Sequence, residues 1–210
     1  MKNLFKLLFA VLVTAAVFTS CMKDNDNSWY EEQQKELQRI EATNKEQAPL
    51  LKQYAEQYLG ENRKLDENSG IWYEVIESPE VPEDKKYEFF TSSGQIYNFA
   101  LKAKYEGRLV KEQGKPFDSS TEPANFTANG LIPAWVRAII PSTFNLNGQT
   151  HEVGGLTEKG LQVGAKIRII TPSTLGYDNK DVKDKDGNIK IAANSPLDFT
   201  IEIVELKRAQ

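Results

Sequence analysis

Side chains that commonly carry chemistry are scarce in this 210-residue chain. The only histidine, His151, lies in the polar, glycine-flanked stretch "NGQTHEVGG", and the only cysteine, Cys21, ends an apolar N-terminal run. These counts exclude zinc sites built from histidine and cysteine. Because no G-x-S-x-G motif accompanies His151, an exposed loop histidine is favoured over a Ser-His-Asp triad. We therefore expect no metal and no cofactor.

The stretch "KDKDGNIK" resembles a calcium loop only faintly, since Val182 stands at the first ligand position and lysines interrupt the acidic residues. A hairpin turn at Asp186-Gly187 is favoured instead. The sequence also carries no glycine-rich phosphate loop. The candidates that remain are aromatic and aliphatic, which predicts a site for an apolar group.

The elements that would position such a site are mostly strands. "GIWYEVIES" alternates as a strand does, and the long run "QIYNFALKAKYEGRLV" leads through the turn "KEQGK" towards a short strand in "ANFTAN". "LIPAWVRAII" begins a short helix after Pro133, and "GAKIRIITP" and "PLDFTIEIVELK" predict two further strands. Strand runs with one helical insertion favour an α+β fold, in which an antiparallel β-sheet wraps a short α-helix.

A helical segment is expected ahead of the sheet. Ser28 and Glu31 have capping-box spacing, and Pro49 is expected to start a second helix. This second helix carries one apolar stripe, formed by Leu50, Leu51, Tyr54, Tyr58 and Leu59. A spacer docked on its own domain is favoured over an arm for dimerisation or client holding. Because the stripe is thin, the domain that follows is expected to fold without the helical segment at residues 28–62.

The chain opens with "MKNLFKLLFAVLVTAAVFTSC", in which Lys2 and Lys6 precede an uncharged run from Leu7 to Val17. This pattern is typical of a secretory signal and is too short for a stable membrane span. Its end resembles the lipobox of bacterial lipoproteins, although Phe18 replaces the usual aliphatic residue. The resemblance implies that Cys21 is acylated and anchors the protein in a membrane. An ordinary secretory signal with a chance cysteine is the alternative.

Removal of residues 1–20 would take away two of the 26 Lys and Arg residues and none of the 30 Asp and Glu residues, leaving a net charge of −6. Such a surface has no general attraction to nucleic acid. The remaining length suits one domain with an extension. We expect a signal peptide at 1–20, a tether at 21–27, a helical extension at 28–64 and one domain at 65–210.

Five segments, taken in order, resemble the FKBP-type peptidyl-prolyl isomerases: "GIWYEVI", "KAKYEGRLVKEQGKPFDSS", "FTANGLIPAW", "GLQVGAKIRIITPSTLGYD" and "IAANSPLDFTIEIVEL". The resemblance covers roughly residues 70–207. It implies an FKBP-like antiparallel sheet half-wrapped around one short α-helix, and an enzyme that isomerises X-Pro bonds.

The resemblance also implies one hydrophobic hollow with named residues. Its expected catalytic residues are Asp118, Tyr177 and Tyr105, and its expected substrate-binding residues are Phe117, Phe126, Leu131, Ile132, Trp135, Ile191 and Phe199. In this interpretation Tyr177 donates a hydrogen bond to the substrate carbonyl, and Asp118 orients Tyr105 or biases the local field. A role in the core alone would explain Asp118 and Tyr177 poorly, because core positions rarely hold a carboxylate or a hydroxyl. For Phe126 and Phe199 a role in the core explains the residue type nearly as well as a role in the site.

Three departures from the family pattern border the hollow. An insert at residues 136–159 permits a second alignment in which Leu156 replaces Trp135 as the floor, but Trp135 is favoured because "LIPAW" keeps the family order. "IAANS" lacks the proline that usually precedes the last strand, and a charged hairpin, "DNKDVKDKDGNIK", is added between Tyr177 and Ile191.

The sequence therefore predicts a peptidyl-prolyl cis-trans isomerase that assists the folding of exported proteins at the cell envelope. It would be lipid-anchored to the outer membrane through Cys21, facing the periplasm or the cell surface, and would act on proline-containing polypeptide clients. A homodimer through residues 28–62 is a further hypothesis. The alternative function is a non-catalytic FKBP-like binding or holding module on a membrane-anchored lipoprotein.

Overall fold

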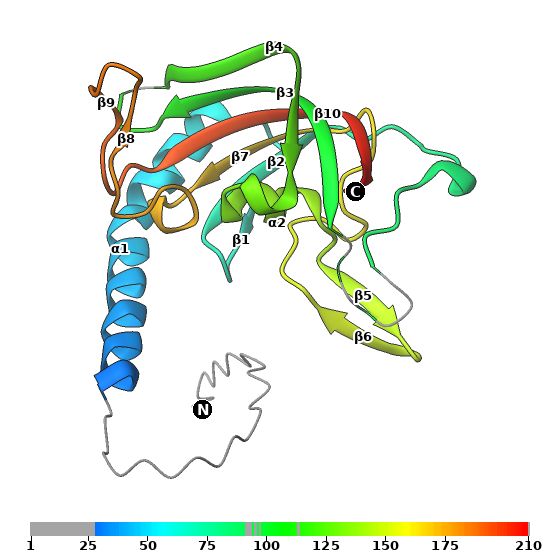
Figure 1. Cartoon of the computed structure of the whole chain (residues 1–210), viewed down its shortest axis with the longest axis horizontal. Helices are drawn as coiled ribbons and strands as arrows, with labels where there is room; N and C mark the ends of the chain where they lie inside the picture. Colours follow the sequence, from blue (N-terminus) through cyan, green and yellow to red (C-terminus); the bar gives the residue numbers. More distant parts are fainter. Residues whose placement is uncertain (1–27, 91–93, 95, 97, 113, 210) are drawn as a thin grey trace.

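A six-stranded antiparallel sheet lies at the centre of the fold, with its strands in the order β1-β2-β7-β10-β3-β4 (Figure 1). The computed structural model describes residues 28–90, 94, 96, 98–112 and 114–209. The strands of the sheet are β1 (Lys64–Asp66), β2 (Ile71–Glu77), β3 (Phe99–Leu109), β4 (Lys115–Thr127), β7 (Lys166–Thr171) and β10 (Leu197–Arg208). The expected signal peptide, Cys21 and the tether lie outside the described residues. Among the helices that the structure describes, none is long and apolar enough to span a membrane.

One face of the sheet curves around the short helix α2 (Pro133–Ile139), which lies in front of the sheet in Figure 1. The core between them is built from alternate strand residues and from one face of α2: Phe99, Leu101, Ala103, Ile167, Ile169, Ile201, Ile203, Ala134, Trp135, Ala138 and Ile139. Because strand side chains alternate between the two faces, every second residue of β3 and β10 reaches this core. The expected α+β fold, with a sheet half-wrapped around a short helix and a helical segment ahead of it, is confirmed.

A long helix, α1 (Ser28–Tyr58), packs on the opposite face of the sheet and passes behind it in Figure 1. Two neighbours in β7 distinguish the faces. Ile169 belongs to the core around α2, whereas Ile170 packs with Leu51 and Tyr54 of α1. The first half of α1 extends beyond the sheet, and its side chains are mostly exposed. The helix is therefore docked through its second half.

A buried carboxylate ties α1 to the sheet. Asp198 of β10 is 1% exposed and accepts hydrogen bonds from Nε (3.0 Å) and Nη2 (2.7 Å) of Arg168 and from the hydroxyl of Tyr54 (2.9 Å). Arg168 also donates to the backbone carbonyl of Tyr58 at 2.8 Å. Burial, followed by the charge of Asp198, raises the pKa of Tyr54, so this hydroxyl remains a donor at neutral pH. A buried charge is tolerated when it is paired and hydrogen-bonded in this way.

The structure corrects one expectation about α1. The helix continues through Pro49, so no second helix begins there. A proline removes one backbone hydrogen bond from a helix interior, and here the buried Gln47 and Leu51 hold the helix to the body on both sides of it. Across the boundary expected at residue 64, Leu51 and Leu59 share a buried cluster with Ile170. The favoured interpretation, a spacer docked on its own domain, agrees with this packing.

β4 also differs from the expectation. It is one strand from Lys115 to Thr127, so the first four residues of "ANFTAN" form its end and not a separate strand, and the last two lie in the 3₁₀ turn that follows. Its pairing with β3 shifts register opposite Ala103–Tyr105 and opposite Gly107–Arg108. Such irregularities bend a strand locally. The bend lets one long strand carry residues for both the rim and the side wall of the hollow described below.

Two small hairpins lie beside the sheet. The insert at 136–159 contains β5 (Thr143–Leu146) and β6 (Gln149–Glu152). The only histidine, His151, is exposed as expected but lies in β6, where its ring stacks on that of Phe144 at 5.1 Å. The other hairpin pairs β8 (Val182–Lys183) with β9 (Ile189–Ile191), and the expected turn at Asp186-Gly187 joins them.

Replacing Leu51 by Ala should lower the free energy of unfolding by about 2–5 kcal/mol, because the side chain is 2% exposed and its loss leaves a cavity under α1. The measurement is equilibrium urea denaturation. Leu37→Ala is the matched control on the same helix, since Leu37 is 61% exposed, and it should change stability by less than about 0.5 kcal/mol. Equal stabilities for the two variants would show that α1 is not docked in solution.

Candidate active site

A glycine in β3 makes room for two aromatic rings at the wall of a hollow. In the register of the sheet, Gly107 lies between Phe199 of β10 and Asp118 of β4. A Cβ atom at position 107 would lie 2.6 Å from Cζ of Phe117 and 2.7 Å from Cε1 of Phe199. The two rings meet edge to face with their centroids 5.7 Å apart. A glycine usually weakens a strand interior, and here its missing side chain is what the two rings require.

The indole of Trp135 forms the floor. Pro133 occupies the first turn of α2, where its missing N–H costs nothing, and sets the helix start so that Trp135 points towards the sheet. Trp135 is 4% exposed. Its ring centroid lies 5.5 Å from that of Tyr105, 5.6 Å from that of Phe199 and 5.2 Å from that of Phe126. The contacts with Tyr105 and Phe199 are edge to face and the contact with Phe126 is tilted, and such contacts orient aromatic rings relative to one another.

The hollow enclosed by these rings has a volume of about 100 Å³. It is lined by Tyr105, Phe117, Asp118, Phe126, Gly130, Leu131, Ile132, Trp135, Tyr177 and Phe199. Of the residues expected from the sequence, Ile191 alone is not part of this lining; it is 2% exposed and packs in the core. Leu156, the alternative floor residue, is likewise a core residue away from the lining. Trp135 therefore occupies the floor.

Three polar side chains face this apolar surface from its rim. The hydroxyl of Tyr105 donates to Oδ2 of Asp118 at 3.0 Å, and the backbone N–H of Ser119 donates to Oδ1 at 3.1 Å. Burial, and then the hydrogen bond to Asp118, raises the pKa of Tyr105 to about 12. Burial, and then the negative charge of Asp118, also raises the pKa of Tyr177. Phenols are protonated at neutral pH even without such shifts, so both hydroxyls can donate, and Asp118 accepts from Tyr105.

Two residues near the hollow were not expected from the sequence. Gly130, in the 3₁₀ turn Ala128–Gly130 before α2, contributes backbone to the lining. Lys190 of β9 brings its Nζ atom to 3.7 Å from Oδ1 of Asp118. Both partners of this contact are partly exposed, so the pair is weak in water. No local signal marks Lys190, because its contact depends on how the added hairpin folds back over β4.

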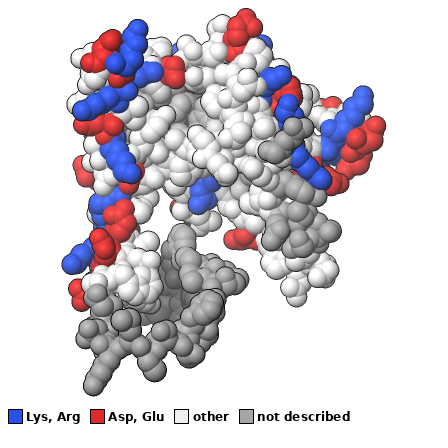
Figure 2. All heavy atoms as spheres, viewed as in Figure 1, with Lys and Arg blue, Asp and Glu red and all other residues white. Residues whose placement is uncertain are grey.

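The surface around the hollow is mostly uncharged. Figure 2 shows few Lys, Arg, Asp or Glu side chains over the middle of this face, whereas charged side chains gather along α1 and at the outer edges. A larger hollow of about 610 Å³ lies between α1 and the β1–β2 region, lined by Pro49, Leu65, Trp72 and neighbouring residues. Size does not locate chemistry, however. The smaller hollow is the one where aromatic rings, phenol donors and a carboxylate converge.

Comparisons with known proteins agree with this geometry. A family model described as FKBP-type peptidyl-prolyl cis-trans isomerase matches residues 96–204. The chain is 24% identical over 176 residues to the FKBP-type 22 kDa peptidyl-prolyl cis-trans isomerase of Escherichia coli, covering 80% of this chain and 68% of that protein.

Two solved structures share the fold. A peptidyl-prolyl cis-trans isomerase from Pseudomonas syringae superposes with a TM-score of 0.50 at 22% identity, over 80% of this chain and 96% of that one. FkpA from Escherichia coli superposes with a TM-score of 0.50 at 24% identity, over 90% of this chain and 76% of that one. At these identities the likeness shows a common fold.

The raised pKa of Tyr105 predicts a stability difference that depends on pH. The unfolded phenol titrates near pH 10 and the folded one near 12, so the contribution of its hydroxyl is complete below about pH 10 and is lost as the pH rises towards 12. The stability of the wild type relative to Tyr105→Phe should therefore decrease above about pH 10. Urea unfolding of both proteins from pH 8 to 11 measures it. A difference that is constant with pH would contradict the raised pKa.

Proposed function

The chain belongs to the FKBP-type peptidyl-prolyl cis-trans isomerases, and we propose that its aromatic hollow catalyses rotation about X-Pro bonds in exported polypeptides at the cell envelope. One observation carries the assignment of the site. The ring cluster around Trp135 encloses a small apolar space, and the phenols of Tyr105 and Tyr177 and the carboxylate of Asp118 stand at its rim.

This arrangement suits a reaction in which no covalent bond between atoms is made or broken. Rotation about an X-Pro bond is opposed by amide resonance, with a barrier of ~18–20 kcal/mol. In the twisted transition state the amide loses its charge separation, so it needs less solvation than the planar ground state. An apolar hollow that excludes water therefore binds the twisted amide better than the planar one, which is the requirement for catalysis.

The polar residues would orient the substrate in that hollow. We assign to Tyr177 a hydrogen bond donated to the substrate carbonyl, since it lines the hollow and a phenol is protonated at neutral pH. Asp118 accepts from Tyr105 and so fixes the ring that forms one side of the hollow. Trp135 would contact the proline ring from below, with Phe126 and Phe199 at its sides. Leu131 and Ile132 close the end near α2.

Turnover of a prolyl peptide tests this assignment. Tyr177→Phe keeps the ring and removes one neutral hydrogen bond, so turnover should fall about two- to tenfold while peptide binding survives. Asp118→Asn should lower turnover with little change in stability, and Trp135→Ala should weaken both peptide binding and stability. Tyr30→Phe is the matched control, because this tyrosine is 58% exposed on α1.

Two outcomes would overturn parts of this proposal. Equal turnover in the wild type and in a Tyr177→Phe, Asp118→Asn double variant would refute the assigned residues. A wild type that binds proline peptides without isomerising them would instead favour a holding module. In that case the insert at 136–159 and the hairpin with Lys190 would be the surfaces to vary next.

The envelope location rests on the N-terminal sequence, which lies outside the described residues. Lys2 and Lys6 precede the apolar run, and the only cysteine of the chain ends it. We propose that the chain is cleaved before Cys21, acylated there, and anchored in the outer membrane, facing the periplasm or the cell surface. Several acyl chains on one cysteine give a stable anchor, whereas one chain gives only weak binding.

Changing Cys21 to Ser should remove the anchor. Wild-type protein expressed in a bacterial host should partition into the detergent phase, and the Cys21→Ser variant should be recovered as soluble or unprocessed protein. Asn27→Ala, which keeps the cysteine, is the control and should behave as wild type. Recovery of wild-type protein wholly in the aqueous phase would refute acylation.

A homodimer through residues 28–62 is a further proposal, and the packing of α1 limits which of these residues could form its interface. Leu51 and Tyr54 are buried against the chain's own sheet, so they are not available to a second copy. Trp29, Tyr30 and Leu37 in the first half of the helix are about 60% exposed. A dimer would therefore use residues 28–40, and sedimentation equilibrium of the wild type decides whether it forms.

A further inference from the structure

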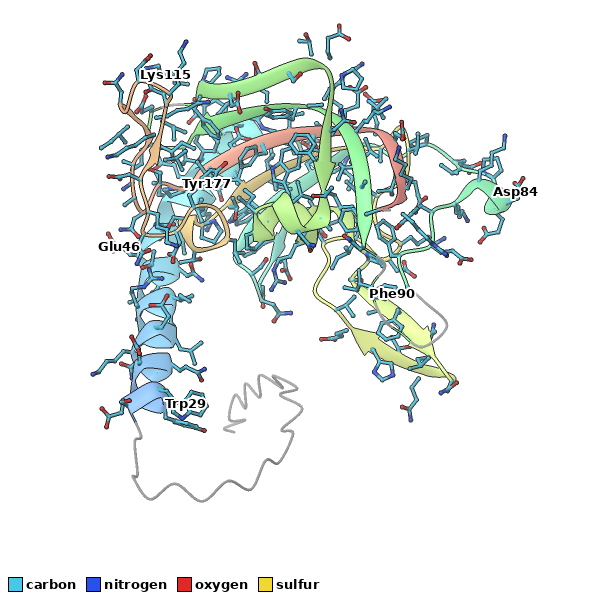
Figure 3. The ribbon with its side chains drawn as sticks, in the orientation of Figure 1. Trp29, Glu46, Asp84, Phe90, Lys115 and Tyr177 are labelled. Atoms are coloured by element: carbon cyan, nitrogen blue, oxygen red, sulfur yellow. The ribbon has the colours of Figure 1, made fainter. Side chains whose placement is uncertain are left out.

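The backbone around Tyr177 is held by contacts on both sides. Tyr177 follows the short 3₁₀ turn Ser173–Leu175, and Figure 3 shows it in the loop beside the middle of α1. The N–H of Asp178 donates to the carbonyl of Ser173 at 2.8 Å, and the carbonyl of Asp178 accepts from the N–H of Asn194 at 2.7 Å. Asp178 has a φ of +55°, a left-handed conformation that is uncommon outside glycine but that aspartate adopts more readily than most residues.

Polar side chains of α1 reach into this same loop. The amide of Gln47, which is 7% exposed, donates from Nε2 to Oγ of Ser173 at 2.9 Å and to the carbonyl of Asn194 at 3.2 Å. Its Oε1 accepts from the backbone N–H of Ser173 at 2.9 Å. One turn earlier, Oδ1 of Asn44 accepts from the hydroxyl of Thr174 at 2.5 Å. Together these bonds fix the start of the loop to the helix.

Arg39 extends this contact to the residue next to Tyr177. Its Nη1 and Nη2 atoms donate to Oδ1 and Oδ2 of Asp178 at 3.0 and 2.6 Å, which is a two-pronged pair. Its Nε and Nη2 atoms donate to the two carboxylate oxygens of Glu36 at 2.9 and 2.7 Å, so the guanidinium is oriented from the other side as well. This geometry constrains the direction of Asp178 and not only its distance, because the guanidinium is planar and rigid.

We propose that Arg39 is a positioning residue, which fixes the loop of residues 173–178 so that the hydroxyl of Tyr177 is held over the hollow. The inference rests on the proposed function, because it concerns the orientation of a residue assigned to the substrate carbonyl. Arg39, Asn44 and Gln47 lie on the side of α1 that faces this loop, at spacings of three and five residues. A displacement of about 1 Å is enough to lower the rate of a positioned reaction.

A role limited to global stability makes a different prediction. Both side chains of the Arg39–Asp178 pair are partly exposed, at 28% and 29%, so water screens the charges and the pair should add little to overall stability. A positioning role requires that the loop loosen while the fold keeps its stability. The two explanations therefore differ in which measurement changes when Arg39 is replaced.

The first experiment is a double-mutant cycle on the full chain with a prolyl-peptide substrate. Arg39→Ala should lower kcat/KM by no more than Tyr177→Phe does, about two- to tenfold, and mainly through kcat. In the Tyr177→Phe background Arg39→Ala should cause no further loss, because the hydroxyl that it positions is already gone. Arg39→Lys keeps the charge without the two-pronged geometry and should give an intermediate loss. Lys52→Ala, which removes an exposed cation from the same helix, should match wild type.

The second experiment does not depend on turnover. Amide hydrogen exchange, followed by mass spectrometry, should be faster for residues 173–178 in Arg39→Ala than in wild type or Lys52→Ala, while the urea midpoint stays unchanged. Unchanged exchange in this segment would overturn the inference. Losses that multiply with those of Tyr177→Phe would also overturn it, since they would show an effect independent of the hydroxyl. A wild type without turnover would refute the proposed function instead, and the exchange result would still decide the role of Arg39.

Discussion

The buried carboxylate of Asp198 is the constraint on which the docking of α1 depends, and its place in β10 connects that docking to the face that carries the hollow. A carboxylate that is 1% exposed is tolerated only while its oxygens are hydrogen-bonded, and its partners come from β7 (Arg168) and from α1 (Tyr54). The next residue along β10 is Phe199, which points to the other face and lines the hollow. One strand therefore links the docking of the helix to the shape of the site.

The shape of the site depends on one glycine as much as on its aromatic residues. Gly107 leaves the space into which Phe117 and Phe199 pack, and any larger side chain there would overlap their rings. The hollow is thus shaped by the register of three strands and by the start of α2. The polar atoms at its rim are few, so their effect on a bound amide depends on orientation more than on number.

The sequence was informative wherever a pattern was local or ordered along the chain. Alternation predicted the long strands, and the order of motifs predicted a hollow with Trp135 at its floor. The docking of α1 was favoured from its apolar stripe, but its polar contacts were missed, because Gln47 and the hydroxyl of Tyr54 have partners more than a hundred residues away in the chain. The β5–β6 hairpin was missed although "NG" at 147–148 marks a turn with positive φ at both positions. Ile191 is buried in the core and is not part of the lining of the hollow, and these two placements look alike in sequence.

The contacts of α1 divide into two kinds with different physical consequences. Leu51 and Tyr54 bury apolar surface and satisfy a buried charge, so they determine whether the helix is docked. Arg39 and Asn44 make directional polar contacts in partly exposed positions, so they determine where the loop beside Tyr177 lies and add little to stability. Arg39 also stands where the docked half of α1 gives way to the exposed half. A partner bound to the exposed half of α1 can alter the site only if it changes the contacts of Arg39. Binding shifts an equilibrium only through a difference in contacts between two states.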